Sequence, residues 1–188
     1  DNTDPIERLF IQWGFSQVFP AKTMCAHVTT WNKNSSVKFR TDVAMMCKLG
    51  FDIKLADMSK DDETYCRTAV QNYNRLKPVV LEGDMYRLVS PYGSNHTSTM
   101  YVGKDKDKAV VFAFDIHPRY AEKILPVRLQ GLDADKMYRV KEINLMPGAN
   151  SSLSGNGEVF SGEFLMNVGL NLFTTQQLNS RVIEVVAE

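Results

Sequence analysis

The spacing of apolar residues along this chain changes once, close to Gly83. Before this position, apolar side chains recur at intervals of three and four residues between short apolar runs, which is typical of helices that alternate with buried strands. After it, they recur at every second residue in short segments, which is typical of half-buried strands. The sequence therefore predicts two regions of different architecture, residues 1–82 and 83–188, within a chain long enough for one or two cores.

The first region is predicted to alternate helix and strand. The expected elements are a helix at 5–14, a strand at 24–29, a helix at 40–49, a strand at 51–55 and a helix at 59–78. Gly50 is expected in the left-handed position after the second helix. Ser59 and Asp62 have the spacing of a capping box, and Pro78 is expected to end the third helix. This order favours βα units in a parallel sheet, which residues outside the chain would have to complete.

The second region is predicted to be all-β. Apolar-rich runs separated by turn residues are expected to form strands at 85–89, 99–102, 109–116, 127–129, 138–143, 159–165 and 182–186. Short strands at this spacing favour an antiparallel β-sandwich or a barrel. The charged residues 104–108 are expected to form the tip of a hairpin.

Composition and spacing exclude several classes of function. Lys and Arg number 22, as do Asp and Glu, so no basic face is indicated and nucleic acid is not an expected partner. The longest apolar runs are far shorter than the ~20 residues that cross a membrane, so no membrane partner is expected. Cys25, Cys47 and Cys66 are spaced for neither a zinc site nor a disulfide framework. His96 and His117 lack ligands at suitable spacing, so no metal is expected.

A series of short motifs follows one order along the chain. They are Asp-Asn-Thr-Asp at 1–4, Met-Cys-Ala-His-Val at 24–28, Phe-Arg-Thr at 39–41, Lys-Leu-Gly-Phe at 48–51, Asp-Met-Tyr-Arg-Leu at 84–88, Arg-Leu-Gln-Gly-Leu-Asp at 128–133, Gly-Glu-Phe-Leu-Met at 162–166, Gly-Leu at 169–170 and Ser-Arg at 180–181. In this order they resemble glycoside hydrolase family 36, the α-galactosidases also called melibiases. The family usually has glycine where Cys25 stands.

The resemblance implies a fold and a reaction. Residues 1–82 would form the C-terminal segment of a catalytic (β/α)8 TIM barrel, and residues 83–188 an antiparallel β-sandwich domain. The implied reaction is retaining hydrolysis of terminal α-linked galactose from oligosaccharides, without a cofactor. Asp1 matches the family's general acid/base by position. The family's nucleophile lies in a Lys-Trp-Asp motif that these 188 residues do not contain, so the segment alone is expected to be inactive.

Two residues of the first region are candidates for the site. Retaining hydrolysis needs two carboxyl groups ~5–5.5 Å apart, one as nucleophile and one as acid/base. Asp1 and Asp4 both precede the first predicted helix, and the resemblance assigns the acid/base role to Asp1, while Asp4 is expected to cap the helix. His27 lies in the segment 24–29, predicted as a strand and its loop, and is a second candidate for contact with the sugar, although an isolated histidine is more often a hydrogen-bonded structural residue.

Other functions stay open on sequence grounds. The chain is also compatible with a non-catalytic carbohydrate-binding or structural β-sandwich module, which would bind sugar without turnover. Within the family, a galactosyl-transferring or an α-N-acetylgalactosaminidase member are the alternatives. The helices of an incomplete barrel would expose an apolar face, so a homo-oligomer or an aggregate is expected.

Overall fold

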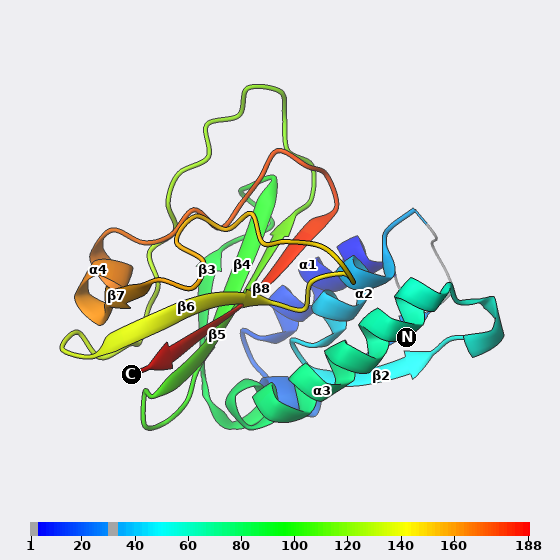
Figure 1. Ribbon diagram of the computed structural model, residues 1–188, viewed down its shortest axis with the longest axis horizontal. Helices are drawn as coiled ribbons and strands as arrows, with labels where there is room; N and C mark the ends of the chain where they lie inside the picture. Colours follow the sequence, from blue (N-terminus) through cyan, green and yellow to red (C-terminus); the bar gives the residue numbers. More distant parts are fainter. Residues whose placement is uncertain (1–3, 30–33) are drawn as a thin grey trace.

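Two sheets of different kinds organise the part of the chain that the computed structural model describes, residues 4–29 and 34–188 (Figure 1). The smaller sheet pairs β1 (Cys25–Thr29) with β2 (Lys48–Asp52) in parallel. The larger sheet has six strands in the order β3-β4-β5-β8-β6-β7, all antiparallel. The elements around the smaller sheet are α1 (Pro5–Phe15), η1 (Ala21–Thr23), α2 (Val37–Ala44), η2 (Leu55–Asp57) and α3 (Lys60–Glu82).

A short polar side chain caps the N-terminus of each of the three long helices. Asp4 Oδ1 accepts the Ile6 N–H at 2.7 Å, and the hydroxyls of Ser36 and Ser59 each accept a first-turn N–H at 3.1 Å. Such a cap satisfies one of the N–H groups that a helix start leaves without a partner. The predicted helices at 5–14 and 59–78 and the capping role of Asp4 are confirmed, while the second helix begins earlier than predicted, at Val37.

Gly50 does not end a helix, and this expectation was wrong. Helix α2 already ends at Ala44, and the Lys48 N–H donates to the Met24 carbonyl at 3.1 Å. The chain therefore pairs with the strand before it, and Gly50 lies within β2 opposite His27.

Pro78 does not end α3, which continues to Glu82. A proline inside a helix removes one backbone hydrogen bond, but here Leu76, Val79 and Val80 are buried in the core on both sides of it. Packing of this apolar face offsets the local cost. Although α3 has 23 residues, neither it nor any other described helix is long and apolar enough to cross a membrane.

The central strands of the larger sheet are buried on both faces. Along β5, Val110, Phe112 and Phe114 belong to the core shared with the helices, and the intervening Ala109, Val111 and Ala113 belong to a second core. The strands are β3 (Asp84–Val89), β4 (His96–Val102), β5 (Lys108–Asp115), β6 (Met137–Ile143), β7 (Val159–Ser161) and β8 (Asn179–Ala187). The predicted hairpin tip at 104–108 joins β4 to β5, except that Lys108 already belongs to β5.

The second core is covered by loops, so the expected second sheet of a sandwich is replaced by less regular structure in the described residues. The predicted strand at 127–129 contributes only an isolated bridge between Val127 and Leu170. The predicted strand at 159–165 is split, because Ser161 caps a short helix, α4 (Gly162–Asn167), through the Phe164 N–H. Apolar residues of these loops, including Leu153 and Leu172, pack against the sheet.

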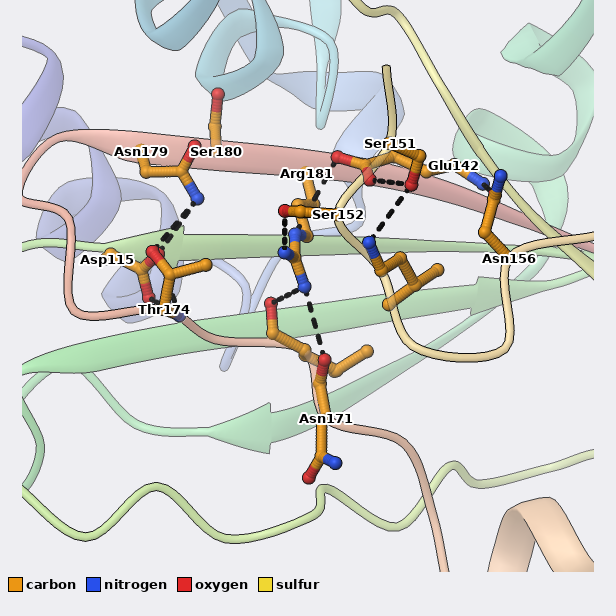
Figure 2. A network of polar contacts seen from close by, with 12 residues as sticks. Asp115, Glu142, Ser151, Ser152, Asn156, Asn171, Thr174, Asn179, Ser180 and Arg181 are labelled. Carbon is orange, nitrogen blue, oxygen red and sulfur yellow. Dashed lines mark hydrogen bonds and ion pairs between the residues drawn. The ribbon is translucent and has the colours of Figure 1, made fainter.

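A buried ion pair fixes these loops to the sheet (Figure 2). Arg181 on β8 and Glu142 on β6 are both buried, and Arg181 Nε lies 3.7 Å from Glu142 Oε1. Arg181 also donates to the Ser152 hydroxyl at 2.6 Å and to the Asn171 and Leu172 carbonyls, while Glu142 accepts from the Ser151 hydroxyl. Because buried charges need several partners, this pair defines where both loops sit.

A second buried charge joins the helices to the larger sheet. Asp42 on α2 is fully buried and accepts hydrogen bonds from Lys38 at 2.5 Å, Tyr65 at 2.9 Å, Asn144 at 2.7 Å and Ser180 at 2.7 Å. Burial and the adjacent Asp42 charge raise the pKa of Tyr65, so its hydroxyl stays protonated as a donor. These donors come from α2, α3, the turn after β6, and β8.

We predict that Asp42→Ala lowers the free energy of unfolding by about 3–5 kcal/mol, because it leaves buried donors without an acceptor. Urea denaturation measures the loss. Asp135→Asn, at an exposed carboxyl, is the control and should change stability by less than about 0.5 kcal/mol. Equal stability of the two variants would contradict the structural role of Asp42.

Candidate active site

The smaller sheet has one covered face and one open face. Ala26 and Val28 of β1 and Leu49 and Phe51 of β2 pack into the core shared with the helices. Because side chains alternate along a strand, the opposite face carries the remaining positions, which include Cys25, His27, Lys48, Gly50 and Asp52. Cys25, Lys48 and Asp52 are exposed and His27 is partly exposed. The open face is therefore polar, and it contains one of the two residues singled out from the sequence.

His27 lies across Gly50 of the neighbouring strand. A Cβ atom at Gly50 would lie 2.5 Å from His27 Cδ2 and 3.0 Å from Nε2, so only glycine leaves room for the ring. Within the described part of the chain, the imidazole has no hydrogen bond that would give it a structural role. The geometry leaves its polar atoms available to a ligand on the open face.

A cleft of about 320 Å³ lies where the segments after β1 and β2 meet. Arg40 and Asp62 belong to the helices that follow the two strands, and Lys54 and Asp57 belong to the segment after β2. The other lining residues are Ser35, Ser36, Val37, Ile53 and Met58. This lining combines hydroxyls with charges of both signs, which suits a polar, uncharged ligand with many hydroxyl groups.

Arg40 ties the cleft to the end of β1. Its guanidinium donates to the Thr29 carbonyl, the last residue of the strand. Burial lowers the pKa of Arg40, and the charge of Asp62 opposes this shift. Arg40 was not among the site residues predicted from the sequence, although it stands within the Phe-Arg-Thr motif at 39–41.

The predicted acid/base, Asp1, lies outside the described residues, so the structure places only the residues that follow it. Asp4 caps α1, as described above. The residues between 30 and 33 that follow β1 are likewise outside the described part. Within 4–29 and 34–188, no three His, Cys, Asp or Glu side chains are placed to hold a metal ion.

Comparison with known proteins gives matches to both regions. The Melibiase family model matches residues 1–83, and the Glycosyl hydrolase family 36 C-terminal domain matches residues 96–185. Alpha-galactosidase 2 of Hypocrea jecorina is 34% identical over 97% of this chain, and probable alpha-galactosidase G of Aspergillus terreus is 32% identical over the same share. Each match covers 24% of the relative, so the chain spans about a quarter of the length of these proteins.

Solved structures match the chain over its whole length. The GH36 alpha-galactosidase AgaB from Geobacillus stearothermophilus superposes with a TM-score of 0.86 at 28% identity, covering 100% of this chain and 25% of that one. Variants of AgaA from the same organism, solved in complex with raffinose and with stachyose, match with the same TM-score and coverage at 27% and 28% identity.

We predict that Gly50→Ala displaces the His27 ring and destabilises the protein by about 1–3 kcal/mol, as overpacking does elsewhere. NMR of the His27 ring and urea denaturation follow the two effects. In the double variant Gly50→Ala/His27→Ala the clashing ring is absent, so most of the lost stability should return. Gly93→Ala is the matched control, because no atom lies within 4 Å of the added methyl. Unchanged His27 resonances in Gly50→Ala would contradict the packing described.

Proposed function

Because this chain belongs to glycoside hydrolase family 36, we propose that it is the C-terminal portion of a retaining α-galactosidase that releases terminal α-linked galactose from oligosaccharides. The observation that carries the proposal is the open polar face of the parallel strand pair, which follows the Asp-Asn-Thr-Asp segment by one helix. The raffinose and stachyose complexes of the AgaA variants support galactose-containing oligosaccharides as the substrate class.

Residues 1–82 are proposed as the last segment of a (β/α)8 barrel. Parallel sheets are normally covered on both faces, yet in the described part of the chain helices pack on one face of β1 and β2 and leave Cys25, Lys48 and Asp52 exposed on the other. In a barrel the second face points to the barrel interior and the carboxyl ends of the strands carry the active site. His27, Gly50 and the cleft at Arg40 would then lie at or near that site. Residues 83–188 form the C-terminal domain of this proposal.

The proposed chemistry needs two carboxyl groups that act in turn. Asp1 would protonate the leaving oxygen and then deprotonate the attacking water, and a second carboxylate would form the glycosyl-enzyme intermediate. The 188 residues contain no Lys-Trp-Asp motif, so the nucleophile would come from elsewhere in a longer polypeptide. His27 is proposed to donate or accept a hydrogen bond to the sugar. No cofactor takes part in this mechanism.

We predict that Asp1→Asn in the full-length protein lowers kcat/KM for an aryl α-galactoside by about 10²–10⁴-fold, because a general acid/base contributes that much. Asp4→Asn is the matched control. Asparagine caps a helix about as well as aspartate, so this variant should keep its activity and stability.

Other outcomes of the same assay separate the alternatives. Binding of galactose without turnover in the full-length protein would favour a carbohydrate-binding module. Turnover only of N-acetylgalactosaminides, or mainly transfer to sugar acceptors, would favour another member of the family. Full activity in Asp1→Asn would remove Asp1 from the mechanism.

We propose that the 188-residue chain, on its own, associates through the surface around the end of α1. Val18 is 76% exposed, and Phe15 and Phe19 stack with their ring centroids 5.0 Å apart while each remains 47% exposed. Light scattering should detect oligomers, and Val18→Ser with Phe19→Ser should reduce their mass, since exposed apolar surface drives association. A monomeric parent chain would contradict this proposal.

A further inference from the structure

His96, at the start of β4, is buried between two carboxylates. It is 4% exposed and pairs with Asp115 across the sheet. His96 Nδ1 lies 2.8 Å from Asp115 Oδ1. Asp115 also accepts from the Thr174 N–H and hydroxyl and from the Asn179 amide, and Figure 2 shows Thr174 and Asn179 beside it. With so many donors aimed at Asp115, its carboxylate is an acceptor, and His96 Nδ1 carries a proton.

The second ring nitrogen faces the other carboxylate without a hydrogen bond. His96 Nε2 is buried, has no hydrogen-bond partner among the described residues, and lies 3.6 Å from Glu122 Oε2. Phe173 stacks on the ring with a centroid distance of 4.7 Å. A neutral imidazole protonated at Nδ1 would direct the Nε2 lone pair at this carboxylate, whereas an imidazolium would direct an N–H at it.

Glu122 belongs to residues 117–126, which we call the strap. The strap lies in the long connection between β5 and β6 that projects beyond the sheet (Figure 1). Glu122 anchors it to the sheet by accepting from the Asn95 amide at 3.1 and 3.2 Å. The hydrogen bond from the Arg119 N–H, at 2.9 Å, lowers the pKa of Glu122 most, and the hydrogen bonds from the Asn95 amide lower it further. This carboxyl is therefore ionised at neutral pH.

The exposed residues of the strap give it little other support. Tyr120 is fully exposed and Leu125 is more than half exposed, so neither side chain is buried. At the start of the strap, His117 contacts Gln177 through Nδ1 at 2.9 Å. The His117 N–H also donates to the Asn95 carbonyl at 3.1 Å, and Pro118 and Ile124 are half-buried. The contacts of Glu122 are the charged part of this attachment.

We propose that the strap is a proton-dependent latch, closed on the sheet while His96 carries protons on both ring nitrogens and released as the second proton is lost. The charged groups facing the ring are Asp115 from β5 and Glu122 from the strap, with Arg119 beyond Glu122. Phe173 and Thr174 do not titrate in this range. The closed state is favoured at low pH, where the ring directs an N–H at Glu122, and is lost at high pH, where it directs a lone pair there.

Hydrogen exchange of the peptide spanning 117–126, corrected for intrinsic exchange at each pH, tests the latch in the intact protein. Protection should fall about fivefold between pH 5 and pH 8, the size of effect that one charge pair supplies. His96→Asn keeps a donor toward Asp115 but cannot titrate, so its protection should no longer change with pH. Glu122→Gln keeps an acceptor for Asn95 without the charge and should behave in the same way.

His117→Asn is the control, because it removes the imidazole that belongs to the strap itself and should leave the pH dependence in place. If His96→Asn does not fold, Glu122→Gln alone tests the latch, since the Glu122 side chain is more exposed than His96 and its replacement disturbs the core less. Protection that is independent of pH in the parent protein would overturn the latch. So would a pH dependence that persists in Glu122→Gln or disappears in His117→Asn.

Discussion

The buried carboxylate of Asp42 is the constraint on which the arrangement of the two regions depends. A charge without solvent is costly unless several donors surround it, and four side chains donate to this one. Asn144 reaches it from a left-handed turn with φ of 61°, and Ser180 reaches it from β8. Any shift of α2 relative to the larger sheet would separate the charge from its donors. The helices and the sheet are therefore held in one relative position.

That position accounts for both cores. The helices cover one face of the larger sheet, and loops held by Arg181 and Glu142 cover the other, so the central strands are buried throughout. The same helices cover one face of the β1–β2 pair and leave the other face open. The helices thus lie between the larger sheet and the β1–β2 pair. The polar side chains of that pair are on its far face, away from the helices. We regard this division as the structural basis of the proposed function.

Much of the local structure was predictable from the sequence, because it depends on neighbours in the chain. The change of period at Gly83, the helix after Asp4 and the capping by Ser59 all rest on contacts within a few residues. The predictions that proved wrong did so because of contacts between residues distant in the sequence. Gly50 lies in a strand because β1 pairs with it, and Pro78 is tolerated because the core packs around it. Ser180 binds Asp42 across 138 positions of the sequence, and no local pattern marks a buried aspartate. For the candidate site, the motifs indicated Asp1 and His27. The cleft at Arg40 could not be predicted, because segments that are distant in the sequence form it.

The stereochemistry of the released sugar tests the central claim most directly. The full-length protein would be mixed with an aryl α-galactoside, and proton NMR would identify the anomer that appears first. A retaining enzyme with two closely spaced carboxyl groups releases α-galactose, which then equilibrates with the β-anomer. We predict this order. Initial release of β-galactose would contradict the retaining mechanism, and no release of galactose would contradict the proposed activity.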